Sequence, residues 1–114
     1  MRLADPSSGT AGPETVEKPN GPLVDAIADI FKLLGDPTRV RILDALTPGE
    51  RCVCDLATIV GLTESAVSHQ LRLLRASRLV RVRRAGRHAF YALDDHHVVG
   101  LLHDARKHVE ESRV

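Results

Sequence analysis

Hydrophobic residues recur at spacings of three, four and seven over five stretches of the chain, the spacing that places side chains on one face of an α-helix. These stretches are residues 23–34, 38–46, 52–60, 63–76 and 94–111. Residues 79–84 instead alternate Val and Arg with a period of two. After a turn at Ala85-Gly86 the chain returns through residues 88–93, which predicts a β-hairpin. The pattern therefore predicts five helices with a hairpin before the last.

Capping and turn residues separate the predicted helices. Gly35 follows the first helix, and Asp36 with Pro37 provides an N-cap and a first-turn proline for the second. Gly61 ends the third helix, and Thr63 caps the fourth. Within the helices we expect buried positions at Val40, Leu43, Leu46, Leu56 and Ile59.

Residues 1–21 are rich in Pro, Gly, Ser and Thr and show no hydrophobic period, so we predict a disordered N-terminal arm. Residues 22–114 then form one folded domain. Its third and fourth helices flank a glycine-containing turn, the pattern of a helix-turn-helix whose second helix enters the DNA major groove. With the hairpin as a wing, the fold class is mainly α with a β-hairpin (α+β), a winged helix-turn-helix.

The fourth helix has two distinct faces. Val67, Leu71 and Leu74 point inward, while polar side chains that reach base edges or phosphates point outward. The DNA-binding candidates on this helix and on the hairpin are Ser65, Ser68, His69, Gln70, Arg72, Arg83, Arg84 and Arg87.

Charge distribution supports the same function. The net charge is only +1, but residues 65–93 hold seven arginines and no Asp or Glu. A basic lobe on a nearly neutral chain is typical of a protein that binds nucleic acid. We therefore expect double-stranded DNA as a partner.

The helix at 94–111 carries potential metal ligands in two pairs, Asp95 with His97 and His108 with Glu111. The two histidines are eleven residues apart, about three turns, so they share a face but stand roughly 16 Å apart along the axis. A tetrahedral zinc site needs all donors within about 2.0–2.2 Å of one ion. One helix cannot close such a site, whereas two antiparallel copies can, which predicts a homodimer with two equivalent sites. A solvated polar face is the alternative reading of this spacing.

Composition narrows the class of protein further. A chain of 114 residues with 3% aromatics allows one small domain with an aliphatic core. No apolar run approaches 18 residues and the N-terminus has no apolar signal segment, so we expect a cytoplasmic protein without a membrane partner. No nucleophile–base pair is evident, and a closed four-ligand site leaves no place for water. We therefore expect no enzymatic activity and no small organic substrate.

Several segments together resemble the ArsR/SmtB family of metal-sensing winged-helix repressors. They are LGDPTRVRIL (34–43), CVCDLA (52–57), TESAVSHQLRLLR (63–75), RRAGRHAFYAL (83–93), and DHH followed by HxxE (95–111). The resemblance implies a homodimer, joined through its N- and C-terminal helices, that binds palindromic operator DNA. It also implies release of that DNA when metal binds, which derepresses metal efflux or resistance genes.

The resemblance assigns the metal ligands as well. In zinc-sensing members the ligand positions of the shared C-terminal-helix site correspond here to Asp95, His97, His108 and Glu111. Two imidazoles and two carboxylates suit Zn²⁺, with Co²⁺ as a tetrahedral substitute.

Other residues near this site have implied roles too. His96 and His103 lie off the helix face that carries these ligands. Either Asp94 or Asp95 is expected to cap the helix, and Asp94 is expected to have no other role. The resemblance further implies that metal-bound His108 donates its second ring N–H to a backbone carbonyl near Arg78, just past the reading helix.

Cys52 and Cys54 leave an alternative open. Thiol-using members of the family bind cadmium, lead or arsenic(III) through the CVC stretch, aided by a third cysteine one turn on or in the N-terminal arm. Here the one-turn position is Ala57, and the arm holds no cysteine. Two thiolates on one helix provide too few ligands for a well-coordinated metal ion. Two interpretations therefore remain open: a remnant or packing pair of cysteines without a metal, and a sensor of soft metals or arsenite.

Two further alternatives concern function. A zinc-buffering dimer without a DNA function would belong to a different class, and the basic lobe argues against it. A repressor with a non-metal inducer is the other alternative, but it would leave the potential metal ligands of the 94–111 helix without a role.

Overall fold

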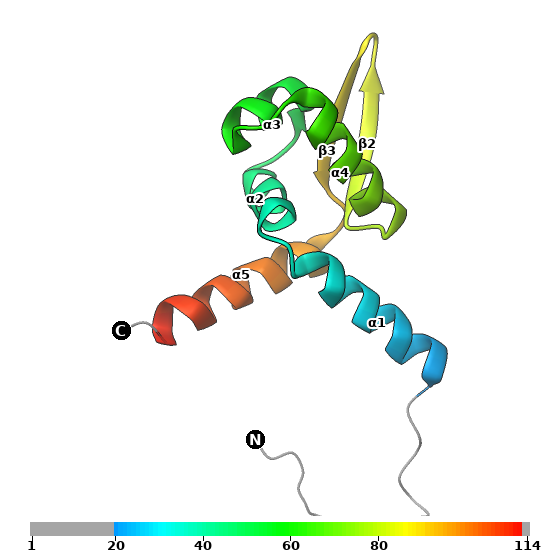
Figure 1. The fold of residues 1–114 in the computed structure, drawn as a ribbon, viewed down its shortest axis with the longest axis vertical. Coiled ribbons are helices and arrows are strands. Elements are labelled where there is room, and N and C mark those ends of the chain that lie inside the picture. The colour runs from blue at the N-terminus through cyan, green and yellow to red at the C-terminus, as the bar shows by residue number, and fades with distance from the viewer. Residues whose placement is uncertain (1–19, 113–114) are drawn as a thin grey trace, which may run out of the picture.

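The structure, a computed structural model, describes residues 20–112 and contains five helices and three strands within that range. Figure 1 shows a compact upper body of α2, α3, α4 and the strands, from whose base α1 and α5 diverge. In chain order the elements are α1 (Gly21–Leu34), α2 (Pro37–Ala45), β1 (Arg51–Cys52), α3 (Val53–Val60), α4 (Glu64–Ala76), β2 (Val80–Ala85), β3 (His88–Leu93) and α5 (His96–Ser112).

Four helices begin at a polar side chain that accepts a hydrogen bond from the third residue on, which satisfies a backbone N–H that the helix leaves unpaired. The pairs are Asn20 with Leu23, Asp36 with Arg39, Thr63 with Ala66, and Asp95 with Val98. α3 ends at Gly61, whose φ of 74° is left-handed and suits glycine. The caps predicted at Asp36 and Thr63 are confirmed.

The predicted hairpin is confirmed, with Val80 opposite Leu93 and Ala85 opposite His88 in antiparallel register. A third strand was not predicted. Arg51 and Cys52 pair with the other edge of β3, giving the order β1-β3-β2. The prediction that Cys52 begins the third helix is therefore wrong, because its backbone is extended and completes the sheet.

One hydrophobic core joins α2, α3, α4, the hairpin and the start of α5. Its most deeply buried side chains are Ile42, Leu43, Leu46, Leu56, Val67, Leu71, Leu74 and Val80. The helix-turn-helix and its wing are thus one packed unit. α1 contributes no buried residue to this core, and α5 contributes only Val98.

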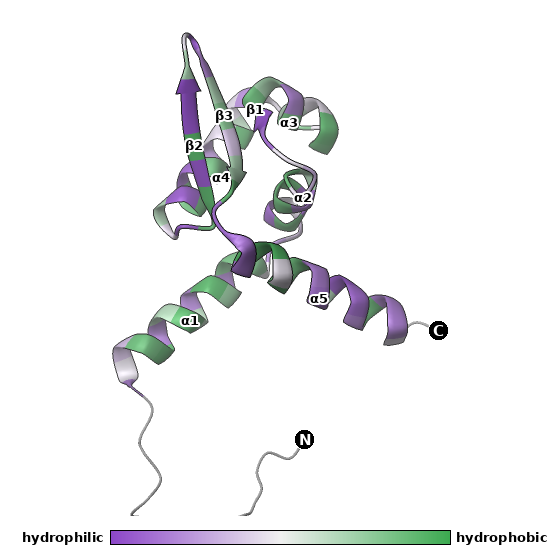
Figure 2. Cartoon of the chain, turned by 180° about the vertical axis from the view of Figure 1, so that it is seen from behind, coloured by the Kyte–Doolittle hydropathy of each residue, from purple (hydrophilic) through white to green (hydrophobic). Residues whose placement is uncertain are grey.

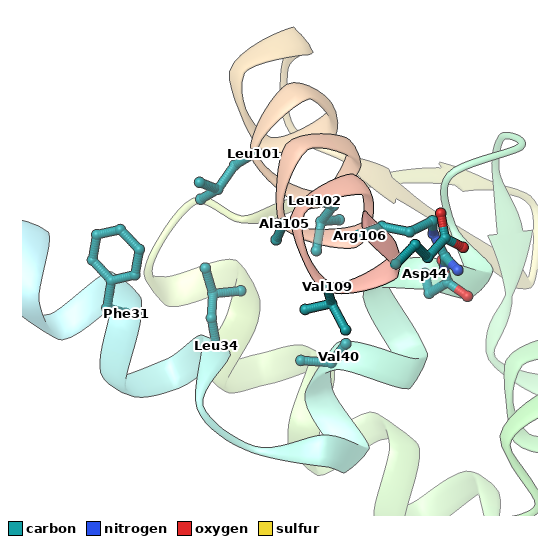
Figure 3. Close-up of a pocket in the computed structure, with 10 residues that line it drawn as sticks. Phe31, Leu34, Val40, Asp44, Leu101, Leu102, Ala105, Arg106 and Val109 are labelled. Atoms are coloured by element: carbon teal, nitrogen blue, oxygen red, sulfur yellow. The ribbon is translucent and has the colours of Figure 1, made fainter. Parts of the chain in front are cut away.

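A continuous apolar surface is left exposed where α1, α2 and α5 meet. On α1, Leu23 and Phe31 are each 58% exposed, and on α5, Val109 is 51% exposed. Figure 2 shows hydrophobic residues along α1 despite its exposure. A groove of about 420 Å³ runs between the three helices, with Leu34 and Leu102 among its walls (Figure 3).

Two expectations about burial are wrong. Val40 is 39% exposed and lines this groove, and Ile59 is 51% exposed on α3. Hydrophobic periodicity identifies an apolar face but does not say whether the same chain covers it.

The domain boundary differs slightly from the prediction. α1 begins at Gly21 and is capped by Asn20, so the folded domain starts two residues earlier than residue 22. The rest of the predicted disordered arm, residues 1–19, lies outside the described residues. Within residues 20–112 no helix has the length and apolarity needed to cross a bilayer.

Candidate functional site

α4 presents a polar face directly opposite its buried face. Val67, Leu71 and Leu74 are fully buried and fix the helix against the core. Ser65, His69 and Arg72 are exposed on the opposite side, whereas Ser68 and Gln70 are half-buried. The core contacts thus set which side chains of α4 face outward.

Gln70 has a partner that the sequence did not predict. Its Oε1 accepts a hydrogen bond of 2.9 Å from Nε of Arg39, near the start of α2. A glutamine that reads adenine needs its carbonyl oxygen for the base, so such a contact would require the Arg39 bond to break. The two residues are 31 positions apart, and no local pattern could have paired them.

The wing separates its arginines into two kinds. Arg84 and Arg87 are exposed at and beside the turn. Arg83 instead holds both carboxylate oxygens of Glu50 at 2.9–3.2 Å, and its guanidinium lies 4.9 Å from the Phe90 ring centroid. The hydrogen bond from Arg83 lowers the pKa of Glu50, and Glu50 in turn raises the pKa of Arg83. Arg83 therefore ties β2 to the loop before β1, a role that the sequence did not reveal.

The first ligand pair lies together at the start of α5. Asp95 is the N-cap, since one of its oxygens accepts a 3.1 Å hydrogen bond from the Val98 N–H, and its other oxygen lies 3.5 Å from Nδ1 of His97. The Val98 N–H, and after it the His97 ring, lower the pKa of Asp95, so the carboxylate form is favoured. The ring of His96 lies against that of His97, with centroids 4.0 Å apart.

Of the two caps that the sequence offered, Asp95 is confirmed and Asp94 is wrong. The Asp94 N–H bonds to the Leu79 carbonyl at 3.1 Å, and the Asp94 carbonyl accepts from Arg81 at 2.7 Å. Asp94 is therefore still part of the extended hairpin end, and the helix turns only after it.

The second ligand pair lies near the other end of the same helix. His108 and Glu111 are exposed in the last turns of α5, and His108 is eleven positions from His97 along the helix. Within residues 20–112, no three His, Cys, Asp or Glu side chains come close enough together to hold a metal ion. Within the described residues, the two predicted ligand pairs therefore stay apart, and a site that uses all four donors would need a second copy of the chain.

The thiol pair has a less favourable setting. Cys52 is half-buried in β1 and Cys54 is exposed in the first turn of α3. The negative charge of Glu64 is the main cause that raises the pKa of the Cys54 thiol, followed by burial and by Cys52 and Asp55. A raised pKa leaves a smaller fraction of Cys54 as the thiolate, the form that binds soft metals, when no metal is present.

Arg78, near the proposed acceptor beyond the reading helix, has an unusual backbone. Its φ of 59° is left-handed, which is uncommon for a residue other than glycine. Its N–H bonds to the Arg75 carbonyl as α4 ends, and the chain then reverses into Leu79 and β2. Any contact to the Arg78 backbone therefore acts at the junction of α4 and the wing.

Comparison with known proteins places these features in a family. Residues 36–82 match the family described as "Bacterial regulatory protein, arsR family". The chain is 50% identical over 86 residues to a "Transcriptional repressor SmtB homolog" of Synechocystis, covering 75% of this chain and 65% of that protein. It is 42% identical over 86 residues to a "Cadmium resistance transcriptional regulatory protein CadC homolog" of Staphylococcus aureus, covering 75% of this chain and 71% of that one.

A solved structure agrees with the fold. The homodimeric winged helix-turn-helix DNA-binding domain of a possible ArsR-family regulator from Mycobacterium bovis superposes with a TM-score of 0.76. The two are 32% identical, and the match covers 80% of this chain and 84% of that one. The sequence matches and this fold together show that the chain belongs to the ArsR/SmtB family of metal-sensing transcriptional repressors and is a regulator rather than an enzyme.

Proposed function

We propose that this protein is a homodimeric repressor that binds palindromic operator DNA and releases it when zinc binds at sites shared between the subunits. Cobalt would substitute for zinc, because it accepts the same donors in a tetrahedral arrangement. The controlled genes would be those of metal efflux or resistance. One observation carries the proposal: the four candidate zinc ligands fall in two pairs near opposite ends of one helix, where a single chain cannot bring them together.

The exposed apolar surface supports pairing through α1 and α5. Large hydrophobic side chains on both helices face solvent in the single chain. They include Leu23, Val24, Ile27, Phe31, Leu101 and Val109. A contiguous apolar face of this kind typically marks a protein–protein interface. Antiparallel packing of two α5 helices would bury it and set Asp95 and His97 of one chain beside the second pair of the other.

The basic surface supports DNA as the ligand of the repressing state. Two reading helices related by a two-fold axis must lie about 34–36 Å apart to occupy successive major grooves. On each α4 we propose that Ser65, Ser68, His69, Gln70 and Arg72 face the bases or phosphates, with Arg84 and Arg87 of the wing on the backbone. Arg83 stays in the proposal as a contact that requires release from Glu50.

Zinc acts by favouring one relative orientation of the subunits. A ligand shifts such an equilibrium only by its different affinity for the two states. His108 has a second ring N–H to donate once its other nitrogen binds metal, and a backbone carbonyl near Arg78 is the proposed acceptor. That bond would join the shared site to the end of the reading helix.

Operator-binding titrations test the proposal. We expect zinc and cobalt to release operator from the wild-type protein, and a His97→Ala/His108→Ala variant to bind operator but not release it. The same titration with cadmium and arsenite, on a Cys52→Ser/Cys54→Ser variant, tests the thiol alternative, which the similarity to a cadmium-resistance regulator favours. Release that needs the cysteines but not the histidines would overturn the zinc assignment.

The same experiment separates repression from metal storage. A zinc buffer would bind the metal as tightly but would show no salt-dependent binding to operator DNA, whereas a repressor loses affinity steeply as salt rises.

A further inference from the structure

α2 makes a polar contact with each of the two helices on which the proposed regulation depends. Near its C-terminal end, Asp44 pairs with Arg106 of α5 (Figure 3). Near its N-terminal end, Arg39 donates from Nε to Gln70 of α4 at 2.9 Å. The same guanidinium donates to the Leu33 carbonyl at the end of α1, at 3.4 Å. One short helix thus contacts the metal-binding helix, the reading helix and the other helix of the apolar surface.

The Asp44–Arg106 pair lies where α5 is otherwise weakly held. Val98 is the only buried residue of α5, Leu102 is half-buried, and every residue after Leu102 is exposed. Among residues 20–112, the pair with Asp44 is the only side-chain hydrogen bond or ion pair between α5 and another helix or strand. Arg106 is two residues from His108 and five from Glu111, so the pair restrains the part of α5 that carries the second ligand pair.

The body of α2 is rigid enough to carry a displacement from one end to the other. Ile42 and Leu43 are completely buried between Arg39 and Asp44. Because these residues share one core with Leu71 and Leu74 of α4, a displacement of α2 is passed on to α4 and is not absorbed between the two helices. The Arg39–Gln70 hydrogen bond adds a polar connection between the same two helices.

We propose that α2 is a lever that transmits the orientation of α5 to the reading helix through the Asp44–Arg106 and Arg39–Gln70 contacts. This inference rests on the proposed function, because the orientation of α5 is what zinc would fix. It is a second route, separate from the proposed bond between His108 and a backbone carbonyl near Arg78. Arg39 and Arg106 are positioning residues, since neither is among the proposed metal ligands or DNA contacts.

The size of the effect is limited by the exposure of the pair. Arg106 and Asp44 side chains are 54% and 52% exposed, and exposed ion pairs change an equilibrium by at most about five-fold. Allosteric couplings are typically about 5- to 150-fold. The lever therefore modulates the response to zinc and does not generate all of it.

The test measures operator dissociation constants without metal and with zinc chloride, and takes their ratio as the coupling. We expect Arg106→Gln, Asp44→Asn and Arg39→Lys each to lower this ratio about two- to five-fold relative to wild type. Lys107→Gln and Arg41→Gln are matched controls that remove one positive charge from α5 and from α2. Within the described residues, neither Lys107 nor Arg41 forms an ion pair.

A double variant decides whether the two contacts belong to one route. If they do, Arg106→Gln/Arg39→Lys lowers the ratio no further than either change alone, whereas independent contacts give multiplied effects. The charge exchange Asp44→Arg/Arg106→Asp should restore the wild-type ratio. Thermal melting and sedimentation check that each variant is folded and dimeric. If Arg39→Lys proves unstable, the exposed Asp44→Asn change still tests the contact between α2 and α5.

Three outcomes overturn the inference. Ratios for Arg106→Gln and Asp44→Asn that match the Lys107→Gln control would exclude a role for the pair. Multiplied effects in the double variant would exclude a single lever. A wild-type protein that keeps its operator in zinc would overturn the proposed function itself, a result distinct from the first two.

Discussion

One oxygen of Asp95 accepts a hydrogen bond from the Val98 N–H, and the other lies 3.5 Å from His97. The same carboxylate therefore starts the helix and is one of the four proposed zinc ligands. Sequence spacing alone marked Asp95 as a ligand and offered it or Asp94 as the cap. The structure shows the cap at Asp95 because Asp94 is still bonded to the end of the hairpin.

These two roles of Asp95 can be separated by substitution. Asn caps a helix about as well as Asp but is a neutral and weaker metal ligand. We expect Asp95→Asn to melt at the same temperature as wild type when no metal is present. We expect its zinc affinity to fall at least about ten-fold, because losing even a residue that only hydrogen-bonds to a metal ligand lowers metal affinity by about that factor. Isothermal titration with a competing chelator and a thermal melt measure the two quantities.

His96→Gln is the control for this prediction. Its ring neighbours His97 but belongs to neither ligand pair, so zinc affinity should not change. Equal losses in the His96 and Asp95 variants would show that the effect comes from disturbing the helix start and not from losing a ligand.

The Glu50–Arg83 pair gives a prediction about pH. The pKa of Glu50 lies below its ordinary value of 4.5, chiefly because Arg83 hydrogen-bonds the carboxylate. A lowered folded-state pKa means that the pair stabilises the protein fully above pH 4.5 and loses this contribution as pH falls through the folded value. Wild type should therefore melt at most a few degrees above Glu50→Gln at pH 7, and the difference should shrink as the pH is lowered below 4.5 and through the folded-state pKa. A difference that persists in acid would show that the pair acts by something other than charge.

At the scale of elements, α4 shows how far a hydrophobic pattern determines structure. Its inward residues Val67, Leu71 and Leu74 are all fully buried, as the spacing predicted. The same reasoning was wrong for Val40, because the chain leaves the apolar face of α2 uncovered there. Periodicity thus locates the apolar face of a helix correctly but does not show whether the same chain or a partner covers that face.

The two faces of α4 should respond differently to alanine. Leu71→Ala removes a side chain that is 0% exposed, which should lower the free energy of unfolding by about 2–5 kcal/mol. Arg72→Ala removes an exposed side chain and should leave the urea midpoint unchanged while weakening operator binding. Urea denaturation and fluorescence anisotropy with operator DNA measure both. An Arg72→Ala protein that unfolds as easily as Leu71→Ala would show that the outer face is structural.

Contacts between side chains far apart in the chain could not be predicted from the sequence. Arg39–Gln70, Glu50–Arg83 and Asp44–Arg106 join residues 31, 33 and 62 positions apart. Each pair consists of ordinary surface residues with many other partners available, so no spacing rule selects them. The fold could be predicted because it depends on local periodicity, whereas these connections depend on tertiary packing.

At the scale of the whole molecule, the single chain combines a packed winged helix-turn-helix with an apolar surface that the chain itself does not cover. α1 and α5 diverge from its base with exposed apolar side chains and a groove of about 420 Å³ between them and α2 (Figures 1 and 3). The proposed zinc ligands lie on α5, the same helix that lines this groove. In the proposed dimer a second copy would cover the apolar face and complete both metal sites in one step, which would tie metal binding to the arrangement of the two reading helices.

Zinc binding to a mixed dimer tests this claim most directly. His97→Ala and His108→Ala each damage both sites of their own homodimer, but a heterodimer purified with two different tags pairs the intact Asp95 and His97 of one chain with the intact His108 and Glu111 of the other. Sites shared across the two-fold axis predict one tight zinc per heterodimer, two per wild-type dimer and none in either homodimeric variant. A heterodimer that binds zinc no more tightly than the two variants alone would contradict a site built from both subunits.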